Sequence, residues 1–317
     1  MARGRRRPRQ VAPLTGDEML HIGLNLLGRY AVGNQRTNER RFRGAFGVGP
    51  EAVAKVFHDL RTTDIQAARV PRANPKNLLW SLKWMKGYAT EELKGSTKDE
   101  KTQRANDWKY AKAIRGLKGL KVRINVCLLL AALFLTLTAT YCFAYDKIVW
   151  RNDDVIVVCS VDGIHCPINE PRMDPGSKWY SHKSNGAGLA YEVALSLQTS
   201  HIVHIAGGVP CATSDLMIFR SDEGLRNKLA DGQRAIADEG YKNDEKCMTR
   251  NFGDTQQTKK YKKRAKARQE TINARIKSFR CMKEHFRHKP HKHPILFEAI
   301  CCLIQYDMEN GHPLFAV

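Results

Sequence analysis

Three acidic residues stand where carboxylates can do metal chemistry. Asp162 follows an apolar, β-rich run in VVCSVDGIHCPI, Asp238 follows a shorter one in RAIADEGY, and Glu270 lies in the basic stretch KARQETINARIKSF. We expect both aspartates to end buried strands and Glu270 to lie on a facing helix, so that the three meet at one edge of a sheet. Carboxylates suit hard divalent cations such as Mg²⁺ or Mn²⁺. Two such ions held together can break and join phosphodiester bonds.

The helix expected around Glu270 carries more polar groups. Glu270, Asn273 and Lys277 share one face, and the run KKYKKRAKAR precedes them. These cations suit the phosphates of a DNA strand. Each acid taken alone is equally compatible with a turn residue or a surface ion pair, and only their joint placement favours a metal site. The predicted DNA-binding residues are Lys183, Lys260, Lys263, Arg264, Arg268, Asn273 and Lys277.

The composition indicates a polyanionic partner. The 317 residues include 53 Lys and Arg against 32 Asp and Glu, a formal net charge of +21. Such an excess favours nucleic acid, although a solvated surface or a ribosome-like basic protein is the alternative. The nine cysteines are odd in number and irregularly spaced, which argues against a disulfide framework and for a reducing compartment.

The chain divides into four predicted parts. Residues 1–10 form a disordered basic arm that resembles a nuclear-localisation signal, and residues 11–120 are helical, with a helix-turn-helix at Gly47–Pro50. We expect this helical part to bind DNA, with a plain helical bundle as the alternative. Residues 121–147 are an apolar segment, and residues 148–317 alternate strands and helices as in a mixed α/β domain of the ribonuclease H type.

Within the last part, the pattern predicts particular elements. Strands are expected at VIVVCSVD, YEVALSLQ, HIVHIAGG and RAIADEGY, and a helix over SDLMIFRSDEGLRNKL. Residues 246–258 are predicted to be a loop, 259–285 one long basic helix and 294–309 an apolar helix. The histidines between His285 and His293 lack the spacing of a zinc site.

Several of these segments resemble a known family. VDGIHCPI, KWYSHKSNGAGLAYEVALSLQT, SDLMIFR, IADEGY, ARQETINARIKSF and the end of the chain from HFRHKP are similar to the DDE endonuclease domain of PIF/Harbinger-like transposases, over about residues 148–317. The resemblance implies a ribonuclease-H-like fold and metal-dependent DNA strand cleavage and transfer. It places Asp162, Asp238 and Glu270 on the catalytic triad and Asp215 on a further metal-binding acid.

The resemblance also implies partners and a location. We expect double-stranded DNA at transposon ends as the substrate, a homo-oligomer, a nuclear location and a separate transposon-encoded DNA-binding protein. A catalytically silent, domesticated DNA-binding protein is the alternative. All three acids are present, which speaks against decay without demonstrating turnover.

The apolar segment departs from the family pattern. Residues 124–145 contain no charge and are long enough to span a membrane, so a single-span membrane protein is a further alternative. A span there would place the acids across the membrane from DNA, given the basic flank on its N-terminal side. A buried helix is the second interpretation. The third is translated intron sequence, since residues 122–146 look inserted between GLKGLK and KIVWRN.

Overall fold

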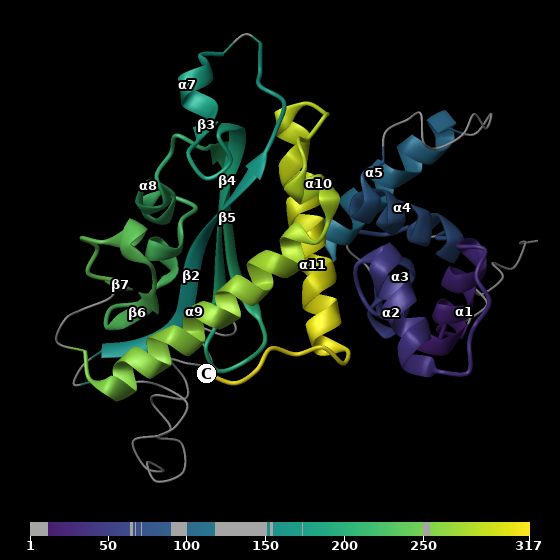
Figure 1. The fold of residues 1–317 in the computed structure, drawn as a ribbon, viewed down its shortest axis with the longest axis horizontal. Helices are drawn as coiled ribbons and strands as arrows, with labels where there is room; N and C mark the ends of the chain where they lie inside the picture. Colours follow the sequence, from purple (N-terminus) through teal and green to yellow (C-terminus); the bar gives the residue numbers. More distant parts are fainter. Residues whose placement is uncertain are drawn as a thin grey trace, which may run out of the picture.

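The structure is a computed structural model, and it describes residues 12–63, 66, 68–70, 72–89, 100–117, 151–152, 155–172, 174–249 and 254–317. It consists of a helical region followed by a mixed α/β region (Figure 1). The predicted basic arm, 1–10, and the apolar segment, 121–147, lie outside the described residues. Within the part of the chain that is described, no helix is long and apolar enough to cross a membrane.

The described part of the first region contains five helices: α1 (Gly16–Leu26), α2 (Gln35–Phe46), α3 (Pro50–Thr62), α4 (Pro75–Gly87) and α5 (Glu100–Gly116). Thr15 begins α1 with a capping box to Glu18. Gly47 ends α2 at a φ of 91°, a conformation that favours glycine, and Pro50 opens α3. The short Gly47–Gly49 connection therefore joins two helices at the predicted place.

The second region contains a seven-stranded mixed sheet. Its strands are β1 (Arg151–Asn152), β2 (Val155–Pro167), β3 (Tyr180–Ser181), β4 (Gly186–Ser196), β5 (Ile202–Pro210), β6 (Gln233–Ile236) and β7 (Cys247–Met248). β2 and β5 flank β4 antiparallel, while β6 runs parallel to β2, and β7 runs parallel to β6. The short strands β3 and β1 pair with β4 and β2.

Helical elements cover both faces of this sheet. On one face, α8 (Asp215–Arg220), η3 (Leu225–Lys228) and η4 (Glu239–Tyr241) pack on the apolar side chains of β2, such as Val161. On the other face, α9 (Gln256–Lys277) crosses the sheet and buries Ala265 against Val157 and Ile236 (Figure 1). The remaining elements are α7 (Gly176–Trp179), α10 (Arg280–Lys283), η5 (Pro290–Lys292) and α11 (His293–Glu309).

Four predicted boundaries are wrong. β2 does not end at Asp162 but continues to Pro167, because β4 pairs with it from Cys159 to Pro167 and satisfies its backbone. The expected helix after Asp215 stops at Arg220, where the Ser221 hydroxyl bonds the Ile218 carbonyl. The expected loop 246–258 contains β7 and the start of α9. The expected helix 259–285 ends at Lys277, before Phe279 turns into the core.

The helical and α/β regions share one apolar core. Buried side chains from Met19 to Leu314 form a single cluster, and α11 lies between the sheet and the first helices (Figure 1). A partly buried ion pair reinforces this junction: the Arg43 guanidinium donates to both carboxylate oxygens of Asp307, at 2.8 and 2.9 Å. The Gly49 amide also donates to Asp307, at 2.8 Å, so the turn between α2 and α3 is bound to α11.

Candidate active site

The register of two parallel strands brings Asp162 and Asp238 together. Ser160 on β2 pairs with Ile236 on β6, and two residues further along each chain lie the two aspartates. Because parallel strands advance equally, both carboxylates reach the same level of the sheet. Asp162 lies inside β2, whereas Asp238 follows the end of β6 and caps η4 by accepting from the Gly240 amide at 2.9 Å.

The Asp162 carboxylate is held by two hydrogen bonds. Its Oδ1 accepts from the Gly163 amide at 2.8 Å, and its Oδ2 accepts from Nδ2 of Asn273 at 2.7 Å. Burial raises the pKa of Asp162, and the charge of Asp238 raises it further, while Lys183 and the two hydrogen bonds lower it. The net upward shift means that the site disfavours two adjacent negative charges, which an added cation would relieve.

Asp215 approaches the same place from the opposite face of the sheet. It is the first residue of α8, whose N-cap is Ser214. A Cβ atom at Gly163 would lie 2.1 Å from Oδ1 of Asp215, so the glycine leaves the space that this carboxylate fills. A Cβ at Gly240 would lie 3.0 Å from Oδ1 of Asp238 and 3.4 Å from Oδ2 of Asp215. The two carboxylates therefore flank Gly240.

Glu270 is the predicted site residue that the structure leaves apart. Its side chain is exposed on α9, and no contact joins it to the three aspartates in the described structure. Asn273, one helical turn further on, does reach Asp162. Within the described ranges, no three Asp, Glu, His or Cys side chains converge closely enough to hold one metal ion. The acids thus gather around Gly163 and Gly240 without forming a complete coordination shell.

A second amide contact sets the position of α9 on the sheet. Gln269 accepts from the Ser160 hydroxyl at 3.0 Å and donates to the Val193 carbonyl at 3.0 Å. Gln269 and Asn273 are four residues apart, and their partners Ser160 and Asp162 are two apart on one face of β2. Together these contacts fix the height of α9, and hence of Glu270, relative to Asp162.

A groove runs between α9 and the strand ends. It has a volume of about 620 Å³ and contains both Asp162 and Asp238. Four lysines of α9 line it: Lys259, Lys262, Lys263 and Lys266. Lys262 is bound to Asp254 at 2.9 Å, whereas the other three make no ion pair within the described part of the chain. A groove with acids on one wall and ammonium groups on the other suits a metal and a phosphate chain together.

The predicted DNA-binding residues have different surroundings. The Lys183 side chain is half exposed, and its Nζ lies 3.7 Å from Oδ2 of Asp215. The side chains of Lys260, Lys263 and Lys277 are exposed on α9. Arg264 donates to the Ala316 carbonyl at the C-terminus. Arg268 departs from the expectation: its side chain is buried and donates to the carbonyls of Leu197 and Thr199, so its charge is directed into the protein.

Sequence reasoning missed the contacts made by the amides. It assigned Asn273 to DNA, whereas the structure places it against Asp162, and it did not single out Gln269. The i, i+4 spacing of these two amides on an otherwise basic helix is the sequence signal that could have indicated a contact with the sheet. The basic run that was assigned to DNA phosphates does supply the lysines that line the groove, namely Lys259, Lys262, Lys263 and Lys266.

Two unpartnered atoms support a fit between this site and a divalent cation. Asp215 Oδ1 and Asn273 Oδ1 are both buried, and neither has a hydrogen-bond partner in the described structure. Buried polar atoms normally have partners, so an oxygen without one is suited to a cation or its bound water. The mutual repulsion of Asp162 and Asp238 points the same way.

Comparison with known proteins identifies one family. Residues 161–305 match the family model described as DDE superfamily endonuclease. No curated protein and no solved structure matches the chain. The matched stretch runs from β2 into α11 and includes all four acids discussed above.

Proposed function

We propose that this chain is a metal-dependent DNA endonuclease of the transposase kind, which cuts and joins phosphodiester bonds at transposon ends. The single observation that carries the proposal is the pairing of Asp162 with Asp238 in a lysine-lined groove. The family match over residues 161–305 supports it. The resemblance of the quoted motifs to PIF/Harbinger-like transposases supports the finer assignment.

The strand arrangement supports a ribonuclease-H-like fold for the catalytic domain. Three antiparallel strands, β5, β4 and β2, are followed by two parallel ones, β6 and β7. One acid lies on β2 and a second follows β6, while α9 crosses the face that carries the first. Acids from distant parts of the chain thus lie at one level of adjacent strands, which is consistent with a two-metal nuclease.

Each acid has a proposed role. Asp162 and Asp238 would hold Mg²⁺ or Mn²⁺ between them, with Glu270 and Asp215 as further ligands. When bound, the ions would activate the attacking water or 3′-hydroxyl and stabilise the leaving oxygen. Glu270 lies on the same helix face as Asn273, which already contacts Asp162. That placement supports its inclusion.

The lysines of α9 have the complementary role. Lys259, Lys263 and Lys266 line the groove beside the acids and would hold the DNA backbone through its phosphates. Lys260 and Lys277, on the same helix, and Lys183, near Asp215, would extend this contact. Binding by point charges positions a strand without reading its sequence. Choice of the transposon end would therefore come from the helical region or a separate DNA-binding protein.

Nicking of a supercoiled plasmid tests this function. With Mn²⁺ present, the protein is expected to nick, and Asp162→Ala and Asp238→Ala are expected to abolish nicking. Asp222→Ala is the matched control, because Asp222 is an exposed aspartate away from the groove lining. Nicking that survives Asp162→Ala and Asp238→Ala would refute the assignment of the site.

One observation favours a second function, a catalytically silent DNA-binding protein. Glu270 is exposed, and within the described part of the chain no three ligands converge on one position. For this alternative, the same assay would show DNA binding that Lys263→Ala weakens, with no nicking at any concentration of Mn²⁺. A response of thermal stability to Mn²⁺ would argue against it, because a silent protein has no need of the metal site.

The proposed nuclear location and homo-oligomeric state need separate measurements. Cell fractionation of the tagged protein is expected to recover it with chromatin, and recovery only in detergent would contradict a nuclear enzyme. Light scattering of the purified protein, alone and with DNA, is expected to show more than one copy per complex.

Transcript sequencing shows whether codons for residues 122–146 occur in the message.

A further inference from the structure

A second basic pocket lies in the helical region and shares no lining residue with the groove. It has a volume of about 370 Å³. Its walls are Arg69 and Val70, from the connection after α3, and one face of α5. The α5 residues that line it are Ala105, Trp108, Lys109, Lys112 and Ala113. Their i, i+3, i+4, i+7 spacing places them on a single stripe of the helix.

The charge of this pocket is uniformly positive. Arg69, Lys109 and Lys112 are exposed, and no ion pair joins their side chains to an acid in the described structure. None of the described residues that line the pocket is acidic. Like charges placed together without acids raise the local potential and attract anions. Solvated lysines on one helix are common, but here the cations come from two separate segments and surround a concave space.

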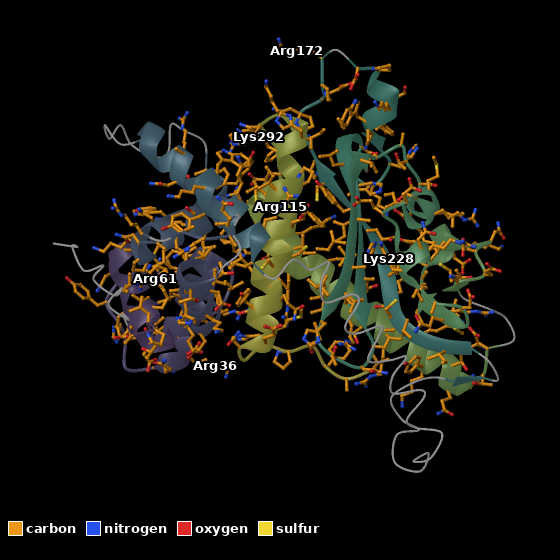
Figure 2. The ribbon with its side chains drawn as sticks, turned by 180° about the vertical axis from the view of Figure 1, so that it is seen from behind. Arg36, Arg61, Arg115, Arg172, Lys228 and Lys292 are labelled. Carbon is orange, nitrogen blue, oxygen red and sulfur yellow. The ribbon has the colours of Figure 1, made fainter. Side chains whose placement is uncertain are left out.

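A third segment adds to the same positive charge. Lys292 of η5 places its ammonium group 5.2 Å from the centre of the Trp108 ring, and Figure 2 labels this side chain. His288 packs 5.3 Å from the same ring, at right angles to it. The histidine-rich run from 285 to 293 therefore contributes packing and charge beside α5. We call Arg69, Lys109, Lys112 and Lys292, grouped around Trp108, the α5 basic surface.

We propose that the α5 basic surface binds the phosphates of DNA outside the segment held in the groove. Charge complementarity identifies the ligand, because a row of unpaired cations around a concave wall matches a phosphate backbone. The surface belongs to the region joined to the catalytic part through α11 (Figure 1). This inference extends the proposed function by adding a second contact for the same substrate, and binding at this surface requires no cleavage.

The salt dependence of DNA affinity tests the proposal. The full-length protein is titrated with a fluorescent DNA duplex at several salt concentrations, and Lys109→Ala and Lys112→Ala are compared with it. Each lost phosphate contact is expected to reduce the slope of log affinity against log salt by about one. Lys228→Ala is the matched control, because Lys228 is exposed on η3 and lies well away from Lys292 in Figure 2.

Three outcomes would overturn the proposal. The first is an unchanged salt slope in both α5 variants. The second is an equal loss of slope in Lys228→Ala, since it would mean that only net charge matters. The third is binding of anionic lipid vesicles, titrated in parallel, that depends on Lys109 without a matching effect on DNA, since it would indicate a membrane partner. If Asp162→Ala nicks plasmid as well as the wild type does, the assignment of the endonuclease site is refuted. The DNA affinity measured for the α5 basic surface does not depend on that result.

Discussion

Asn273 donates from Nδ2 to Oδ2 of Asp162 at 2.7 Å, and this bond links the long basic helix to the central strand of the sheet. The other amide atom, Oδ1, is buried and unpartnered in the described structure. Asn273 therefore orients one oxygen of Asp162, the proposed metal-binding acid. It is a positioning residue, whose effect acts through Asp162.

Replacing Asn273 with Ala is expected to reduce plasmid nicking by about tenfold or more, because a hydrogen bond to a charged group contributes about 1.5–3 kcal/mol. The bond also lowers the pKa of Asp162. Its loss should therefore move the acidic limb of the pH–rate profile to higher pH.

DNA affinity should stay unchanged in Asn273→Ala, which separates positioning from DNA contact. Gln257→Ala is the control, since Gln257 is an exposed amide residue of the same helix. A fall in DNA affinity without a shift in the pH profile would contradict this role.

Asp162→Asn is expected to increase thermal stability at neutral pH. The pKa of Asp162 is raised in the folded protein, so folding disfavours its ionised form, and the cost is fully present above the folded pKa. The gain should shrink as the pH falls through the ordinary range of aspartate, near about 4, where the carboxyl is protonated in both states. Melting temperatures across this range measure it.

The amide introduced by Asp162→Asn keeps its hydrogen bond to α9. If the Asn273 side chain flips, its Oδ1 accepts a hydrogen bond from the new amide nitrogen at position 162. Asp222→Asn, at an exposed aspartate, should show no such pH-dependent gain. If Asp162→Asn is instead less stable than the wild type at neutral pH, then burial and the charge of Asp238 do not make the ionised Asp162 carboxylate destabilising.

Divalent cations are expected to stabilise the wild-type protein. A ligand that binds only the folded state at about a hundred times its Kd contributes about 2.7 kcal/mol. Melting curves with Mn²⁺ should therefore shift upward, and Asp162→Asn and Asp238→Asn should each abolish the shift. This measurement needs no DNA and no turnover. A shift that persists in both variants would place the cation elsewhere.

The sequence predicts most elements because their local signals agree with their packing. α1 to α4 begin at capping residues or prolines that are visible in the sequence, and α2 ends at Gly47. The longer strands β2, β4, β5 and β6 are also predicted, since their apolar runs are buried, whereas the two-residue strands β1, β3 and β7 are not. The end of β2 is not predictable locally, because Gly163 looks like a strand end, and only pairing with β4 carries the strand to Pro167.

Arg268 and Lys263, on one helix, should respond in opposite ways. Arg268 is buried and donates to two carbonyls, so Arg268→Ala is expected to lower the free energy of unfolding by about 3 kcal/mol. Lys263→Ala should leave stability within about 0.5 kcal/mol but reduce the salt slope of DNA binding by about one. Urea unfolding and salt titration of both variants measure this. Equal stability of the two variants would mean that the buried guanidinium is dispensable.

The candidate site could be predicted only in part, for reasons visible in these residues. Asp162 and Asp238 follow apolar runs, so both are recognisable, and strand register brings them together. Arg268 looks the same as its basic neighbours in the sequence, and only the carbonyls of Leu197 and Thr199 explain its burial. Asp215 fills the space left by the missing side chain of Gly163, and this tertiary contact has no local signal in the sequence.

Asp307→Ala is expected to destabilise the whole protein by about 3 kcal/mol or more. The substitution leaves the Arg43 guanidinium without its partner and the buried Gly49 amide without an acceptor. Because the core is continuous, urea should unfold both proteins in one transition followed equally by tryptophan fluorescence and circular dichroism. Asp222→Ala is the control. Two separate transitions in the wild-type protein would contradict a shared core.

The place of α11 limits how such a protein can be rearranged. Its apolar side chains pack on α3 and α5 as well as on β5 and α9, although it is the last helix of the chain. The core of the helices α1 to α5 is continuous with α11. Grafting these helices alone onto another protein would therefore expose the apolar surface that α11 covers. If the proposed function holds, new target preferences would arise by substitution on the helices in place, so that DNA recognition and cleavage would be inherited together.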